Sequence, residues 1–222
     1  MFTLLKRLIL NQLHLLRLPE LDLPKETIHE FDDIYDRHIS TAEGKIVPFE
    51  CRYPKYMFLN YLIETKDVLV HGTNKSDIVS FEPRKQTLFN GKPVKAVFAA
   101  SDGVWSLFFA VINRVGYVGS LRNLCITSPT KKGIKRYYYF SLNKDFHGEC
   151  WSDGTIYFLP KKDFKPGGIK DEWICETAVK PLAKMTVTAS EFPFKEHIFR
   201  HSETDSVVKT WVKSLVLNKK LP

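Results

Sequence analysis

The sequence predicts an α+β fold with a mostly antiparallel β-sheet and an N-terminal helical region. Helical periodicity dominates before about residue 66, short apolar strands dominate after it, and one strong helix interrupts those strands. A regular alternation of strands and helices would instead indicate a doubly wound parallel sheet, and the chain lacks that alternation. We therefore expect an N-terminal helical region over residues 1–66 and a second domain over residues 67–222.

The composition is that of a globular protein with an excess of positive charge. The chain has 222 residues, a mass of 25.7 kDa and 44% apolar residues, which excludes an intrinsically disordered chain. Its 33 lysines and arginines exceed its 25 acids by eight, and residues 131–170 hold nine basic residues against four acidic ones. Such a local excess indicates either a solvated charged surface or one that guides a polyanion.

Several classes of protein are excluded at this level. No run of about 18 uncharged apolar residues occurs, so we expect no transmembrane segment. The N-terminal stretch lacks a basic region ahead of its apolar residues, which argues against a signal peptide. The four cysteines are widely spaced without a C-x-x-C pair, so we expect no metal site and instead reduced thiols in a cytoplasmic protein.

The first element expected is an amphipathic helix that ends at Pro19. Its polar stripe of Arg7, Asn11 and His14 lies opposite an apolar stripe. The apolar stripe consists of Phe2, Leu5, Ile9, Leu13 and Leu16. We expect this helix to dock on the body of the protein; binding of a membrane surface or of a partner is the alternative.

The remaining elements follow in order along the chain. A second helix is expected over residues 25–37, a buried helix over residues 104–114 and a closing helix over residues 207–217. Strands are expected at residues 67–70, 95–100, 135–142, 155–159, 172–179 and 182–188.

Three segments in this order resemble the ADP-ribosyltransferase fold family, in its diphtheria-toxin and poly(ADP-ribose) polymerase branch with a His–Tyr–Glu pattern. The strand ending in His71-Gly72-Thr73 is similar to the family's nicotinamide-site H-G-[ST]. Residues 97–102, followed by an aromatic helix, resemble its Tyr-Phe-Ala-like unit. The strand beginning at Glu172 looks like the late strand that opens with the catalytic glutamate. The resemblance covers roughly residues 67–190 and implies a split sheet of ADP-ribosyltransferase type.

The resemblance implies that NAD is bound as a substrate by His71, Gly72, Thr73, Phe98 and Ser101. A glycine directly after a strand lets a flat ligand lie against bare backbone, since it has no Cβ. His71 can hydrogen-bond a ribose hydroxyl, and Thr73 adds a hydroxyl group. Phe98 stands where the family commonly has a tyrosine; its ring can stack on nicotinamide, but it has no hydroxyl to donate, and a plain core role is the alternative.

The catalytic acid has two main candidates. A carboxylate that holds the ribose 2′-hydroxyl stabilises positive charge at C1′ as the bond to nicotinamide breaks. Strand alternation places Glu172 and Glu176 on one face, so periodicity does not choose between them. Position favours Glu172, which opens the strand; Glu149, or no catalytic acid at all, is the remaining alternative.

Two sets of basic residues are candidate contacts for anions. Lys161, Lys162 and Lys165 lie in the loop before Glu172, which helps to select the acceptor in the resembled fold. Arg84 follows His71 closely and could grip the phosphates of NAD as a bidentate donor. Structural ion pairs or plain solvation are the alternative roles.

These residues lead us to expect a mono-ADP-ribosyltransferase that moves ADP-ribose from NAD to a macromolecular acceptor, either protein or nucleic acid. A toxin or effector role is compatible with that activity. One alternative is an enzyme similar to RNA 2′-phosphotransferases, which also use NAD and an H-G-T-like string. Another is a catalytically inactive module that binds nucleic acid through its basic residues.

Overall fold

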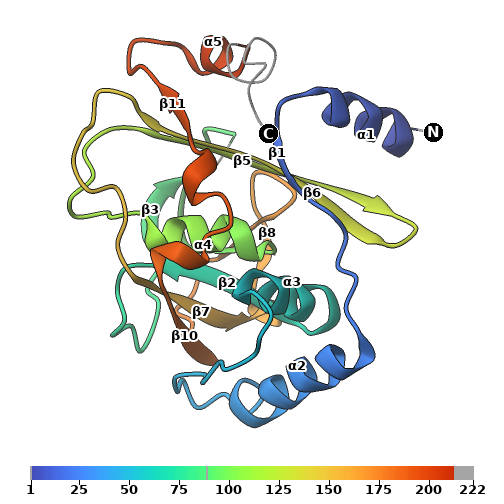
Figure 1. The fold of residues 1–222 in the computed structure, drawn as a ribbon. Helices are drawn as coiled ribbons and strands as arrows, with labels where there is room; N and C mark the ends of the chain where they lie inside the picture. The colour runs from blue at the N-terminus through green and yellow to red at the C-terminus, as the bar shows by residue number, and fades with distance from the viewer. Residues whose placement is uncertain (1, 89, 213–222) are drawn as a thin grey trace. The chain divides into compact units, whose positions relative to one another are not determined.

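The strands expected after residue 67 pair into mostly antiparallel sheets in the computed structural model, which describes residues 2–88 and 90–212 (Figure 1). The α+β class is therefore confirmed. The chain divides into two units, which are described separately below. Unit 1 comprises residues 1–21, 115–150 and 194–222, and unit 2 comprises residues 22–114 and 151–193.

Unit 2 contains most of the helices and a seven-stranded sheet. Its helices are α2 (Lys25–His38), α3 (Lys55–Thr65) and α4 (Gly103–Val111), with short 3₁₀ turns at Lys161–Asp163 and Ala189–Glu191. Its strands are β2 (Val68–Thr73), β3 (Arg84–Thr87), β4 (Pro93–Ala100), β7 (Gly154–Pro160), β8 (Lys165–Pro166), β9 (Glu172–Cys175) and β10 (Ala183–Val187). The strand order is β10-β7-β2-β4-β9-β8, and β3 pairs with the far part of β4.

This sheet is split between β2 and β4. The two strands share a single paired position, Val70 with Ala100. Beyond it, the rest of β2 pairs only with β7, while residues 97–100 of β4 pair with β9. Because neighbouring strands that stop pairing must diverge, a space opens between His71–Thr73 and the middle of β4.

Helix α4 lies across β2 and β7 at very short range (Figure 1). Asp102 caps its N-terminus, since the carboxylate accepts the backbone N–H of Trp105 at 2.8 Å. Two glycines allow the close approach. A Cβ on Gly72 would lie 1.9 Å from the carbonyl oxygen of Ser106, and one on Gly154 would lie 1.9 Å from that of Ala110. A side chain at either position would push the helix off the sheet.

Apolar residues fill the other face of the sheet. The central members of this cluster are fully buried and come from neighbouring strands: Leu69, Tyr157 and Leu159. Val97 and Ala99 of β4 extend the cluster toward β9. Along each strand these residues alternate with residues that face α4, which is the side-chain period of two typical of a β-strand.

Unit 1 is built around one long strand. Its elements are α1 (Phe2–Gln12), β1 (Leu16–Leu18), β5 (Leu121–Thr130), β6 (Gly133–Asn143), a 3₁₀ turn (Lys195–His197), β11 (Phe199–His201) and α5 (Val207–Val212). Strand β6 forms a hairpin with β5, and along its other edge it pairs with β1 antiparallel and with β11 parallel. Its three consecutive tyrosines, Tyr137–Tyr139, are fully buried, so they offer no stacking surface to nucleic acid.

Most expected elements occur within a few residues of their predicted bounds, and three differ. The first helix ends at Gln12, because Leu16–Leu18 pair with β6 instead of continuing the helix. The strand expected over 172–179 ends at Cys175. The closing helix is described only to Val212, and residues 213–217 lie outside the described part of the chain.

The sequence missed α3 and β5, as well as the short strands β1, β3, β8 and β11. Helix α3 has apolar residues on most of its surface and is largely buried, so it lacks an amphipathic period. Strand β5 contains Pro129, which has no backbone N–H and therefore argues against a strand. In the structure it pairs with Ile134 close to the hairpin turn. The boundary expected between residues 66 and 67 does not coincide with the division into units, because α3 packs on β2 and α4.

In the described residues, no helix combines the length and the apolar character needed to cross a bilayer. The four cysteines are unpaired thiols, and three of them are buried.

Replacing Gly154 by alanine should reduce stability by forcing α4 away from the sheet. We expect Gly154→Ala to lower the free energy of unfolding by about 3 kcal/mol, the upper end for overpacked sites. Gly91→Ala is the control: its Cβ would meet nothing within 4 Å, and only its positive φ of 84° is unfavourable, at about 1 kcal/mol. Equal losses in urea unfolding would contradict the close-packing argument.

Candidate functional site

A cavity of about 780 Å³ opens where β2 and β4 diverge in unit 2. The residues that line it come from β2, β3, β4, α4, the start of β9 and the loop that follows β2. Of the residues proposed from the sequence, the cavity brings together His71, Gly72, Thr73, Arg84, Phe98 and Glu172. These positions are spread over a hundred residues of sequence, so only the fold unites them.

His71 is held across the split in the sheet. Its Nδ1 lies 2.7 Å from the carbonyl oxygen of Phe98, so Nδ1 carries the proton and donates it. This leaves Nε2 as an acceptor for a ligand hydroxyl. Burial, with a smaller contribution from the Arg84 guanidinium, lowers the pKa of His71 and outweighs the opposing effect of the Phe98 carbonyl. The edge of Phe81 packs against the imidazole at 4.9 Å between ring centres.

Gly72 lines the cavity, but its missing side chain serves a different purpose from the one expected. Its Cβ would collide with the backbone of α4 at Ser106, not project toward a ligand. Helix packing alone is therefore enough to require a glycine at this position. Close packing of the helix is the structural reason for this glycine.

Aromatic rings form a large part of the wall. Phe98 lines the cavity from β4 as a half-buried residue. Phe81, Trp105 and Phe109 line it as well, from the loop after β2 and from α4. Phe81 and Trp105 were not among the candidates drawn from the sequence. Aromatic rings bind flat heterocycles by stacking, so this wall suits a nicotinamide or an adenine ring.

Glu172 is a buried carboxylate on the cavity wall, at the first position of β9. Its Oε1 accepts the backbone N–H of Gly168 at 2.5 Å, and its backbone pairs with the same loop through Gly167 and Ile169. The loop thus fixes the side chain through Oε1. A Cβ at Gly167 would lie 2.7 Å from Oε1, so the loop also needs this glycine.

Glu176 lies outside the site. It follows the end of β9, is exposed, and forms an ion pair with Lys165 at 3.0 Å. Alternation placed it on the same face as Glu172 only on the assumption that the strand continued past Cys175. The cavity lining includes Glu172 and not Glu176.

Ser101 does not line the cavity. Its hydroxyl contacts Asp171 at 3.2 Å and accepts the indole N–H of Trp173 at 3.1 Å. These contacts join the end of β4 to the start of β9. Ser101 therefore holds the two residues on either side of Glu172 and is not part of the cavity lining.

Three cations reach the cavity. Arg84 is the one proposed from the sequence; it is exposed on β3 and acts electrostatically on His71. Lys75 and Arg114 also line the cavity and were missed. Lys75 follows β2 closely, and Arg114 follows α4, so a search of the residues just after motif-bearing elements would have found both.

The lysines proposed as acceptor contacts do not line the cavity. Lys161 lies over the Trp173 ring at 5.3 Å, and Lys165 pairs with Glu176. Lys162 is exposed on the 3₁₀ turn. Two of the three lysines therefore have structural contacts of their own, which is the alternative role considered for them from the sequence.

No family model, no curated protein and no solved structure matches the chain. Within residues 2–88 and 90–212, no group of three or more histidine, cysteine or acidic side chains is arranged to hold a metal ion.

The lowered pKa of His71 should make the protein less stable in acid. Below pH of about 6.5 the unfolded chain binds a proton at His71 that the folded chain rejects, so stability is lost as pH falls through that value. His71→Asn retains a donor for the Phe98 carbonyl but does not titrate. The stability advantage of the wild type over this variant should therefore shrink between about pH 7.5 and pH 5.5 in urea titrations. A difference that stays constant over this range would show that burial of the neutral ring is not the cause.

Proposed function

We propose that unit 2 is an NAD-dependent mono-ADP-ribosyltransferase. One observation carries the proposal: the three segments that resemble that family lie on three adjacent strands, β2, β4 and β9, and His71, Phe98 and Glu172 line one cavity. Segments that matched by chance would have no reason to meet in this way. The cavity volume of about 780 Å³ falls in the usual range for small-molecule sites.

In the proposed complex, nicotinamide lies in the split between β2 and β4. Phe98 and the neighbouring aromatic rings stack on the heterocycle, and the backbone of Gly72 is available to its carboxamide. Nε2 of His71 accepts a hydroxyl of the nicotinamide ribose. The hydrogen bond from Nδ1 to Phe98 supports this role, because it holds the ring in the tautomer that accepts at Nε2.

Glu172 is the proposed catalytic residue. Its carboxylate accepts the ribose 2′-hydroxyl, so that negative charge lies beside C1′ as the glycosidic bond breaks. The bonding pair leaves with the nicotinamide nitrogen, which becomes neutral, and C1′ gains oxocarbenium character. A nucleophile of the acceptor then bonds to C1′ and loses its proton to solvent. The loop contact to Oε1 supports this role by fixing the carboxylate before the substrate arrives.

Arg84, Lys75 and Arg114 are the proposed contacts for the pyrophosphate of NAD. A guanidinium can grip two phosphate oxygens at once. Asp77 and Glu82 also line the cavity, and their carboxylates repel the negatively charged pyrophosphate. The three cations are therefore needed for the cavity to bind a dinucleotide.

Replacing Glu172 should abolish turnover without abolishing binding. We expect Glu172→Gln to slow nicotinamide release from NAD by about two to four orders of magnitude, because the amide cannot stabilise the developing charge. Its affinity for NAD, measured by calorimetry, should change only slightly. Glu176→Gln is the matched control and should keep wild-type turnover, since Glu176 is exposed outside the cavity.

Wild-type turnover by the Glu172→Gln variant would refute the assignment. If that variant still transferred a phosphate from a 2′-phosphorylated RNA to NAD, the phosphotransferase alternative would take its place.

Replacing Arg84 should weaken NAD binding selectively. We expect Arg84→Ala to reduce the affinity for NAD by about tenfold, as for the loss of one charge-assisted phosphate contact, with no change for nicotinamide alone. Lys162→Ala removes a nearby exposed cation that does not line the cavity, and should leave both affinities unchanged. An equal loss for NAD and nicotinamide would place Arg84 at the nicotinamide end or in a purely structural role.

A further inference from the structure

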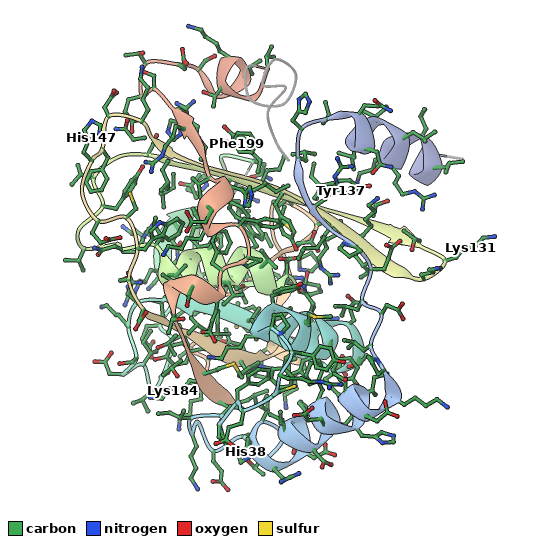
Figure 2. The ribbon with its side chains drawn as sticks, viewed as in Figure 1. His38, Lys131, Tyr137, His147, Lys184 and Phe199 are labelled. Atoms are coloured by element: carbon green, nitrogen blue, oxygen red, sulfur yellow. The ribbon has the colours of Figure 1, made fainter. Side chains whose placement is uncertain are left out.

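Helix α1 of unit 1 docks on its own sheet through polar residues. Asn11 accepts hydrogen bonds from the Tyr137 hydroxyl at 2.8 Å and from the Lys135 ammonium at 3.2 Å. Lys6 donates to the carbonyl oxygen of Thr127 on β5. Figure 2 shows Tyr137 on the strand beneath this helix, with Lys131 at the tip of the hairpin. The side of the helix that carries Asn11, together with the buried Leu10, is therefore the side that meets the protein.

Four aliphatic side chains of the same helix face solvent. Leu4, Leu5, Leu8 and Ile9 are exposed to 53%, 56%, 54% and 54%. Residues at this spacing share one helix face. For Leu5 and Ile9 the sequence predicted the reverse, since both belong to the stripe expected to dock on the body of the protein. A surface helix gains nothing by leaving four large aliphatic side chains in water, so such a face usually marks an interaction site.

The positive charge of the chain is concentrated in the same unit. Unit 1 holds 15 lysines and arginines against 6 acids, a net charge of +9, whereas unit 2 holds 18 against 19, a net charge of −1. Several of the cations of unit 1 are exposed: Lys6, Arg17, Lys131, Lys132, Lys144, Arg200 and Lys209. A partner that binds the exposed face of α1 therefore also has to be compatible with the high positive charge of unit 1.

We infer that unit 1 binds an anionic membrane surface, with α1 lying in the plane of the interface and its four aliphatic side chains inserted among the acyl chains. An anionic bilayer offers acyl chains to the apolar face of α1 and negatively charged headgroups to the cations of unit 1. A second copy of the chain would bring two units of +9 together. Nucleic acid would neutralise the positive charge but would leave the aliphatic side chains of α1 in water. The tyrosines that would stack on bases are buried.

The experiment is cosedimentation of the full chain with vesicles. Vesicles of phosphatidylserine mixed with phosphatidylcholine should retain the protein, and vesicles of phosphatidylcholine alone should retain much less. Rising salt should weaken the interaction, because it screens the cations from the surface. The double substitution Leu5→Glu and Leu8→Glu should weaken vesicle binding by about tenfold or more, since it removes apolar contact and adds repulsion.

The matched control is Val115→Glu with Val118→Glu. These side chains are also in unit 1, are 94% and 73% exposed, and bring the same change of charge away from α1. They should lose only the small electrostatic part of the binding. Thermal unfolding of both double variants should match the wild type, because all four positions are exposed.

Equal binding by the two double variants would overturn the inference, as would binding to both kinds of vesicle alike or to neither. Retention by a DNA or RNA duplex without any retention by anionic vesicles would assign the basic unit to nucleic acid instead. A dimer in solution that the Leu5→Glu and Leu8→Glu variant disperses, again without vesicle binding, would assign the face to a second copy. None of these outcomes depends on turnover of NAD, so the inference stands or falls separately from the proposed function.

Discussion

The separation of β2 from β4 is the constraint on which the rest of unit 2 depends. The strands pair only through Val70 and Ala100, and one side-chain hydrogen bond, from His71 to the Phe98 carbonyl, spans the gap that follows. This bond does two things at once. It replaces part of the missing ladder for a backbone carbonyl that would otherwise lose its partner, and it presents an imidazole acceptor to the cavity. Had the strands continued to pair, the cavity would be filled by the sheet, and His71 and Glu172 would belong to an ordinary sheet surface.

The split is tolerable because each half of the sheet is held from other directions. Helix α4 clamps β2 to β7 through the two glycine contacts, and β4 is held by β9 and β3. The glycine of the H-G-T string therefore supports the scaffold through one face and lines the site through the other. A short motif can keep a glycine for helix packing even where its neighbours face a ligand, so the residue types of a motif do not by themselves say which residues touch substrate.

The positive charge is concentrated in one of the two units, although the segments of the two units alternate along the sequence. The unit that holds the cavity is close to neutral, with cations placed inside the cavity beside acids, and the unit that carries α1 is strongly basic. A local cation in a cavity recognises a defined phosphate, whereas a broad positive field recognises an extended surface. The net charge of +8 for the whole chain hides this division, because three separate segments contribute to unit 1.

The sequence by itself determined the class of fold, the positions of most strands and helices, and the segments that carry His71, Phe98 and Glu172. These depend on local periodicity and on short strings, which act within a few residues. It did not determine where β9 ends, and so could not separate Glu172 from Glu176. It also did not show that Ser101 lies outside the cavity lining, or that Lys75, Trp105 and Arg114 belong to it. It also placed Leu5 and Ile9 of α1 against the protein, whereas both are exposed. Tertiary structure decided these points, because a helix or strand with two usable faces is oriented by the free energy of packing against distant partners, such as Tyr137 for Asn11, and not by its own pattern.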